Sequence, residues 1–239
     1  MKIGTTLAIA TACAALTACG GGETAQTPTN DTAAMNGSDN MMMADNEKSD
    51  PQQLVDEATA EVNKMKQDPK MAGLLEKAKG VYIVPEYGQG AFLVGGRGGA
   101  GVVSAHQGGS WTSPAFYNFG GLSVGPQAGG EGGEVAFLLM SDAAVDAFMT
   151  GNQVALNADA GLTIIDYSAA TQASAGKGDI ILWSDTEGAY AGATISVSDL
   201  NWSDDNNTTY YGGKVDPAQV LTGKKTNPKA SELTSALPS

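Results

Sequence analysis

The sequence contains few of the residues that most active sites use. It has one histidine, one arginine and two cysteines, and aromatic residues make up 6% of the chain. A catalytic zinc usually takes three ligands from histidine, cysteine and carboxylate side chains, so His106 cannot supply the usual set and no metal or other cofactor is expected. Basic residues are also scarce, since 13 lysines and arginines face 26 acidic residues and the formal net charge is −13. We therefore expect no nucleic-acid partner, because phosphate neutralisation needs a basic surface.

A long apolar run near the start of the chain is also missing. The apolar stretch at residues 5–16 is too short to span a bilayer as a helix. Lys2 before it and small residues after it are typical of an export signal. The tetrapeptide Leu16-Thr17-Ala18-Cys19 resembles the bacterial lipobox, in which the cysteine is lipidated and becomes the new N-terminus. We predict a lipoprotein signal peptide at 1–18 and a lipid anchor on Cys19; an ordinary cleaved signal with an incidental cysteine is the alternative.

Removal of this signal would leave Cys19 as the last cysteine, so packing and not a disulfide must hold the domain together. Several acyl chains such as palmitate on Cys19, which the lipobox implies, would anchor the chain stably, whereas one chain binds only marginally. In familiar Gram-negative systems an acidic residue directly after the lipidated cysteine favours retention in the inner membrane, and this position is Gly20 here. We expect a lipid-anchored protein of the cell envelope, at the periplasmic face of the outer membrane.

Residues 19–49 show no apolar periodicity and predict a disordered tether behind the lipidated cysteine. Met41-Met42-Met43 could be a copper(I) tract, but no histidine or cysteine accompanies it and a solvated linker is favoured. At residue 50 the domain begins, with Asp50 as a helix cap and Pro51 in the first turn. Apolar residues then recur at helical spacing, and Pro69 starts a second helix that we expect to end with Gly80 as its C-cap. We expect this amphipathic pair to pack on its own domain; a helix lying on a membrane is the alternative.

Short apolar runs separated by glycine, proline, asparagine and serine predict an antiparallel β domain between residues 81 and 197. The expected strands are 81–84, 91–94, 101–105, 115–119, 135–140, 161–165, 179–183 and 190–197. We also expect a helix at 142–149, a hairpin tip at 204–207 and short helices at 216–221 and 229–237. The 32 glycines exceed what turns need and indicate bulges, bends or close backbone approach. The fold class is therefore α+β: a glycine-rich antiparallel β-sandwich or barrel-like core, with an N-terminal amphipathic helix pair and short C-terminal helices.

Three motifs that suggest chemistry lack the context that the chemistry requires. Residues 96–101 fit G-x-G-x-x-G, but a strand and not a helix is expected after them, so nucleotide binding is not favoured. Residues 121–125 fit G-x-S-x-G around Ser123, but no helix should follow and the histidine precedes the serine, which argues against a hydrolase. Glu131 and Glu134 are better explained as solvated surface than as glycosidase carboxylates.

Several segments resemble one known family when they are taken in order. They are 77–85, 91–101, 111–116, 120–134, 155–160 and 210–212. Together they resemble the SYLF domain of eukaryotic actin-patch proteins and bacterial lipoproteins, over residues 53–237 of the expected domain at 50–239. The resemblance implies phospholipid or phosphoinositide binding and no catalytic activity. Actin binding also occurs in the family but is not expected for an exported bacterial protein.

The resemblance is weakest where charge matters. The turn 184–188, often basic in the family, carries Asp185 and Glu187 here, which argues against recognition of phosphoinositide headgroups. Arg97 and Lys79 are the best-placed phosphate partners, although a surface or structural ion pair is favoured over phosphate contact for Arg97. The candidate acyl-contact residues are aromatic and could instead be core: Trp111, Phe116, Tyr117 and Phe119.

The function expected from the sequence is a non-catalytic lipoprotein, tethered to a membrane, that binds phospholipid. A structural envelope protein that makes only protein contacts is the main alternative, and a serine hydrolase is the third.

Overall fold

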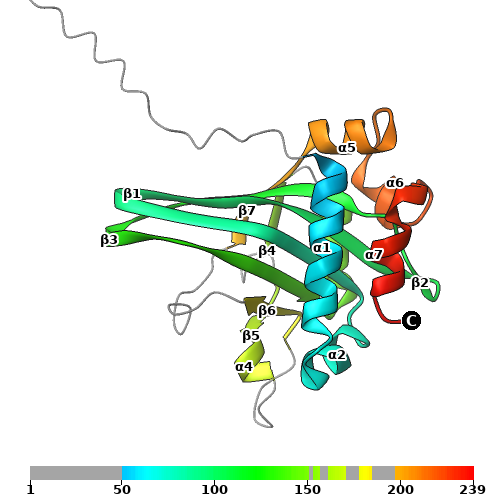
Figure 1. Ribbon diagram of the computed structural model, residues 1–239, viewed down its shortest axis with the longest axis horizontal. Coiled ribbons are helices and arrows are strands. Elements are labelled where there is room, and N and C mark those ends of the chain that lie inside the picture. Colours follow the sequence, from blue (N-terminus) through cyan, green and yellow to red (C-terminus); the bar gives the residue numbers. More distant parts are fainter. Residues whose placement is uncertain (1–49, 151–152, 157–160, 171–177, 185–196) are drawn as a thin grey trace, which may run out of the picture. The chain divides into compact units, whose positions relative to one another are not determined.

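The computed structural model describes residues 50–150, 153–156, 161–170, 178–184 and 197–239 (Figure 1). Within the long strands, residues 87–97 and 121–132 are described by their backbone only. All described residues belong to one compact unit, 45–239. The predicted signal peptide, Cys19 and the predicted tether lie outside the described residues, as does the acidic turn at 185–188.

The N-terminal helix pair forms as predicted. Helix α1 (Pro51–Met65) begins where the Asp50 side chain accepts a hydrogen bond of 2.9 Å from the Gln52 amide, and α2 (Pro69–Leu75) begins at Asp68 in the same way. Proline at the first position of each helix loses no intrahelical bond there. The apolar face of α1 is buried and packs against β1. The helix therefore packs on its own domain, and the apolar face that a membrane-surface helix would need is covered.

Gly80 is not the C-cap of α2, because this helix ends at Leu75 and Gly80 begins the first strand. A Cβ atom at Gly80 would lie 3.0 Å from the Leu139 side chain and 3.2 Å from the Ser104 carbonyl oxygen. Tight packing of the strand, and not a left-handed helix end, accounts for this glycine.

Two very long strands, β1 (Gly80–Gln107) and β3 (Ala115–Leu139), dominate the sheet and pair antiparallel along almost their whole length. They merge five of the shorter strands expected from the sequence. The glycines interpreted as separators lie inside the strands and often face each other, as Gly88 faces Gly132 and Gly98 faces Gly120.

Both strands extend beyond the helices and then bend back (Figure 1). The bend coincides with the register shift between Phe92, opposite Ala128, and Leu93, opposite Gly125. We call the projecting part, residues 88–96 of β1 and 121–130 of β3, the β arm. At its base the two halves of β1 meet, because Gly101 lies against the backbone of Ile83 and the ring of Tyr82.

The remaining strands complete an open sheet with the order β2-β1-β3-β6-β5, to which β7 and β4 are added at β3. Their bounds are Ser110–Trp111 for β2, Gln153–Leu156 for β4, Ile164–Asp166 for β5, Ile180–Ser184 for β6 and Val197–Trp202 for β7. The α+β class is confirmed, but the described sheet is not a closed barrel. It is also not wholly antiparallel, because β5 and β6 pair in parallel.

Short helices pack around the base of the two long strands (Figure 1). They are α3 (Asp142–Thr150), α4 (Tyr167–Ala170), α5 (Asp204–Tyr211), α6 (Pro217–Leu221), the 3₁₀ helix η2 (Pro228–Ala230) and α7 (Ser231–Ala236). The helices expected at 142–149, 216–221 and 229–237 are thus confirmed. The hairpin tip expected at 204–207 is wrong: these residues begin α5, in which Asp204 and Asp205 favour the positive N-terminal end of the helix dipole.

Among the described residues no helix has the length and apolar character needed to cross a membrane.

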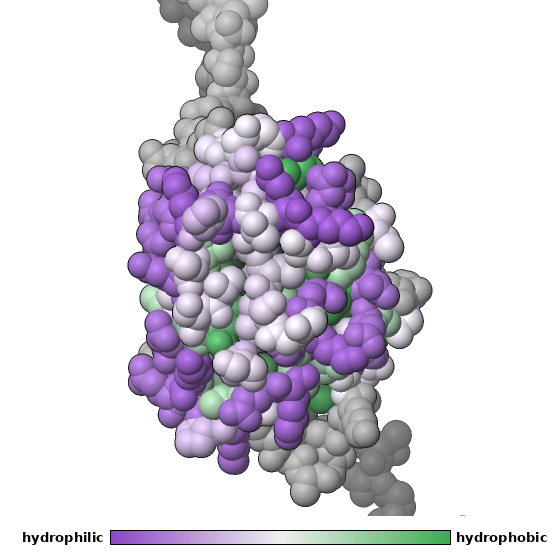
Figure 2. Space-filling model, turned by 90° about the vertical axis from the view of Figure 1, so that its right-hand side faces the viewer, coloured by the Kyte–Doolittle hydropathy of each residue, from purple (hydrophilic) through white to green (hydrophobic). Residues whose placement is uncertain are grey.

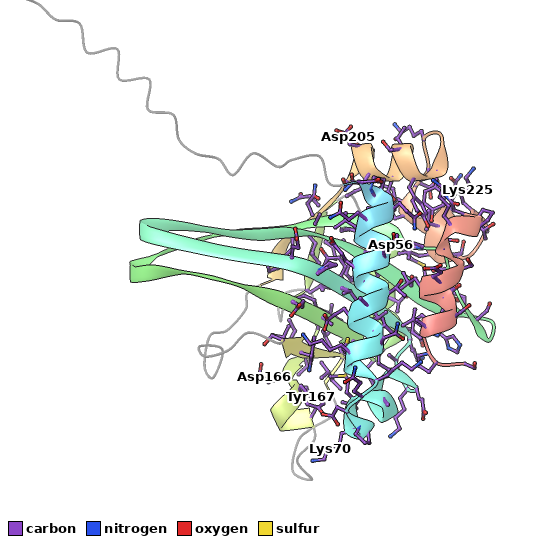
Figure 3. All side chains as sticks on the ribbon, viewed as in Figure 1. Asp56, Lys70, Asp166, Tyr167, Asp205 and Lys225 are labelled. Carbon is purple, nitrogen blue, oxygen red and sulfur yellow. The ribbon has the colours of Figure 1, made fainter. Side chains whose placement is uncertain are left out.

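Helices α2 and α4 are joined by a hydrogen bond. The Tyr167 hydroxyl, at the start of α4, donates to the side chain of Asp68, the N-cap of α2, near the position of Lys70 (Figure 3). This bond, together with the Lys70 amide, holds the pKa of Asp68 below its usual value.

Candidate functional site

Three of the four aromatic residues predicted to contact lipid belong to the core. Phe116 and Tyr117 are 0% exposed and Phe119 is 3% exposed. The Tyr117 hydroxyl donates to the Phe148 carbonyl at 2.6 Å, and burial raises the pKa of Tyr117 well above its usual value. A surface patch of these rings does not exist in this structure, and an acyl chain would reach them only if the core opened.

Trp111, the fourth predicted aromatic, is half-buried in β2. Its indole N–H donates to the Pro238 carbonyl at 2.6 Å, and its ring lies 5.1 Å from the ring of His106. Trp111 therefore links the short β1–β2 hairpin to the C-terminal end of the chain and does not join the buried rings in one apolar surface.

Lys79 and Arg97, the two predicted phosphate partners, are not brought together. The Lys79 ammonium lies 2.6 Å from an Asp142 carboxylate oxygen, in an exposed ion pair. The Lys79 carbonyl accepts from the His106 amide, which fixes Lys79 beside the end of β1. Arg97 lies nine residues before His106 on the same strand, about 30 Å away at the usual rise of an extended chain. Its backbone faces Gly121, and its side chain lies outside the described part.

The motifs that the sequence analysis set aside are indeed in the wrong setting. Ser123 lies within β3 opposite Gly95, so the strand-to-helix turn of a nucleophile elbow is absent there. Residues 96–101 lie within β1, which continues as a strand to Gln107. Glu134 forms an ion pair of 3.2 Å with Lys64, which accounts for it as a surface residue. In the described part of the chain no group of three or more metal-ligating side chains comes together.

The β arm is the most distinctive surface feature, and it combines projection with a lack of charge. Residues 88–96, GQGAFLVGG, and residues 121–130, GLSVGPQAGG, contain no charged residue. Their backbones pair with each other, and this ribbon extends beyond the helices (Figure 1). Pairing satisfies backbone N–H and C=O groups between the strands, which lowers the cost of moving a ribbon out of water. The arm is therefore a projecting ribbon without charged residues, whose two strands pair with each other.

Sequence reasoning missed the arm because it interpreted the glycine-rich segments as breaks between strands. A signal was nevertheless present. Both segments lack charge over nine or more residues, whereas charged residues flank them at Glu86, Arg97 and Glu131.

Comparison with known proteins identifies the family. Residues 120–239 match the family model described as "Ysc84: Las17-binding protein actin regulator". The chain belongs to the Ysc84 family, the SYLF-domain family that its motifs predicted. The matched residues include one side of the arm, β7 and the C-terminal helices.

Relatives of this Ysc84-family chain occur in fungi and animals. It is 30% identical over 167 residues to the SH3 domain-containing protein PJ696.02 of Schizosaccharomyces pombe, covering 66% of this chain and 38% of that protein. It is 29% identical to Protein YSC84 of Saccharomyces cerevisiae, covering 66% of this chain and 35% of that protein. For the human SH3 domain-containing YSC84-like protein 1 the identity is 27%, covering 67% of this chain and 48% of that protein. The aligned part thus spans about a third to a half of these relatives.

Proposed function

We propose that this chain is a membrane-tethered bacterial lipoprotein whose Ysc84-family domain, residues 50–239, binds phospholipid and catalyses no reaction. The observation that carries the proposal is the β arm, a paired, uncharged ribbon that projects from the domain. In the proposal, acyl groups on Cys19 and the tether at 19–49 keep the arm beside the periplasmic face of the outer membrane.

The charge of the chain supports apolar contact as the binding force. A net charge of −13 gives no attraction to anionic lipid, so a basic surface cannot be the main contribution. Burying one leucine- or phenylalanine-sized side chain contributes about 1.5–3 kcal/mol, and Phe92, Leu93 and Val124 lie at or near the bend of the arm. A few such side chains equal the contribution of one acyl chain, which alone gives marginal binding. The arm adds a second contact to the anchor and holds the domain itself against the membrane surface.

The name of the family model refers to Las17 and actin, and the relatives contain SH3 domains. We propose phospholipid and not actin as the partner of this chain, because the predicted export signal would separate it from cytoplasmic filaments. We propose no catalysis, because Ser123 lies within strand β3. The unsubstituted chain should therefore show no esterase activity that the substitution Ser123→Ala could abolish.

Vesicle flotation of residues 19–239 carrying Cys19→Ser tests arm binding without the anchor. Vesicles of phosphatidylethanolamine and phosphatidylglycerol should carry the protein upward, and 0.5 M salt should not release it, because apolar contact is not screened. The double variant Leu93→Glu and Val124→Glu should lower the bound fraction at least tenfold, since a charge resists transfer into the apolar phase by about 2.5–3.5 kcal/mol at the bilayer centre and less at its surface.

The matched control is Ala60→Glu with Ser235→Glu, which adds the same charge at two exposed helical positions. It should float like the unsubstituted chain. Absence of the unsubstituted protein from every vesicle fraction, or equal losses in both double variants, would overturn arm-mediated binding. Circular dichroism of each variant establishes that the fold is retained.

A further inference from the structure

A polar pocket lies at the opposite end of the domain from the β arm. It is bounded by the β1–β2 hairpin, the segment that leads into β3, and the chain from Thr222 to Thr234, and its volume is about 390 Å³. This volume falls within the range of about 300–1,000 Å³ that is usual for small-molecule sites. Because β2, α6 and α7 lie at the other end of the molecule from the arm (Figure 1), the pocket stays accessible when the arm contacts a membrane.

The lining of this pocket is uncharged and rich in hydroxyl groups. Seven of its thirteen residues are serine or threonine, and Asn227 and Gln107 add side-chain amides. Trp111 is its one aromatic lining residue. Such a lining can exchange many hydrogen bonds with a polyhydroxylated molecule while the indole contacts its apolar face.

Several of these hydroxyls have hydrogen-bonding capacity left. Among the residues that the structure describes, the hydroxyls of Thr226 and Ser231 have no hydrogen-bond partner. The Thr112 hydroxyl accepts from the Ala105 amide at 3.0 Å and keeps its own proton to donate. The pocket therefore offers both donors and acceptors to a ligand.

The frame of the pocket is fixed by hydrogen bonds that do not use these groups. The Asn227 amide N–H donates to the Ser113 hydroxyl oxygen at 3.0 Å, and the Asn227 side chain donates to the Tyr210 carbonyl at 2.6 Å. Trp111 is held by its bond to Pro238. Because these side chains are already held in place, the pocket does not lose much conformational entropy when a ligand binds.

Lysines outnumber acidic residues at the rim, although the whole chain is acidic: three lysines are adjacent in sequence to lining residues, against one glutamate, Glu232, which follows Ser231. Lys224 and Lys225 lie between the lining residues Gly223 and Thr226, and Lys229 follows Pro228. All three lysines are exposed, and Lys225 extends outward beside α6 (Figure 3). Figure 2 shows this face of the domain, where weakly polar surface in the centre is bordered by strongly hydrophilic residues. An uncharged floor with a lysine rim favours a ligand that has hydroxyls at one end and a negative charge at the other.

We propose that this pocket binds an acidic sugar. The sugar hydroxyls contact the serine and threonine side chains, its ring lies against Trp111, and its carboxylate or phosphate faces Lys224 and Lys225. The proposal is independent of phospholipid binding, because it concerns a different end of the domain and a soluble ligand.

Isothermal titration of the Cys19→Ser chain, residues 19–239, tests this directly with glucuronate, glucose 6-phosphate, glucose and inorganic phosphate as probes. The two acidic sugars should bind saturably, and glucose should bind about tenfold more weakly, because two exposed ion pairs contribute modestly. The double variant Lys224→Glu and Lys225→Glu should weaken both acidic sugars by at least this factor and leave glucose nearly unchanged. Inorganic phosphate that binds as tightly as glucose 6-phosphate would show a simple anion site and overturn the sugar proposal.

Ser231→Tyr supplies the steric test, because it places a ring in the pocket from an exposed position of α7. Its control is Ser235→Tyr, an exposed residue of the same helix that does not line the pocket. The first variant should abolish sugar binding and the second should retain it, while both float with vesicles like the unsubstituted chain. Unaltered sugar binding by Ser231→Tyr, or no saturable binding of any sugar by the unsubstituted chain, would sink the proposal.

Discussion

At the scale of single residues, the tightest packing is found where β1 folds back on itself. A Cβ atom at Gly101 would lie 2.5 Å from the Ile83 carbonyl oxygen and 2.8 Å from the Tyr82 ring. Neither neighbour can move freely, because one is strand backbone and the other is a fully buried ring. We expect Gly101→Ala to lower the free energy of unfolding by about 1–3 kcal/mol, the usual cost of overpacking, as measured by urea denaturation.

Gly120→Ala is the control for this change at a position with open space, since no atom lies within 4 Å of a Cβ added there. Alanine in an unstrained strand position should stabilise slightly, by about 0.5–1 kcal/mol. Equal destabilisation by both substitutions would show that the glycines serve strand flexibility and not close approach.

At the scale of elements, one side chain connects α5 to the long strand β3. Asn207 is 1% exposed; its side-chain oxygen accepts from the Phe116 amide at 3.1 Å, and its nitrogen donates to the Phe116 carbonyl at 2.8 Å. Asn207→Ala would leave the Phe116 amide buried without a partner, whereas the Phe116 carbonyl would still accept from the Ser203 amide at 3.0 Å. We expect a loss of about 1–3 kcal/mol in unfolding free energy, the usual cost of one unsatisfied buried group.

The adjacent Asn206→Ala provides a comparison, since Asn206 is also buried but its side chain makes no hydrogen bond within the described residues. Its substitution should cost less than half as much as Asn207→Ala in the same denaturation experiment. A similar cost for both would mean that volume, and not the bonds to Phe116, holds α5 in place.

The same elements show which parts of the fold could be predicted from sequence. Asp50-Pro51 and Asp216-Pro217 are local signals, and the helices that they predict are present. The start of α5 at Asp204-Asp205 resembles a turn locally and becomes a helix through the tertiary bonds of Asn207. The long strands were missed because pairing of glycine with glycine across β1 and β3 is a non-local property.

The candidate site was predicted less completely than the fold. The aromatic residues 116, 117 and 119 were recognised as apolar contact residues, but spacing along a strand cannot distinguish a surface patch from a core. Lys79 was identified as a cation, yet its partner Asp142 is 63 residues away and only the fold brings them together. The pocket is assembled from the β1–β2 hairpin and the C-terminal segment, so no single stretch of sequence contains it.

At the scale of the whole molecule, buried phenols link the stability of the domain to alkaline pH. Tyr82, Tyr117, Tyr210 and Tyr211 are buried, and desolvation raises the pKa of each above the ordinary value of 10.0. A folded-state pKa above the unfolded value contributes stability that is fully present below pH 10 and is lost as the pH rises through the folded values. We therefore expect the domain to unfold cooperatively in alkali, in a step that ionises all four phenols together.

Phenolate absorbance at 295 nm, followed alongside near-ultraviolet circular dichroism, measures this step. The buried four should ionise only where the dichroism signal collapses. Tyr167 should titrate before them, because partial burial and its bond to Asp68 raise its pKa to about 12. The opposite result would be a single smooth titration of every tyrosine near pH 10 while the dichroism signal stays unchanged. It would show that the four phenols ionise without opening the core, and it would contradict their buried packing.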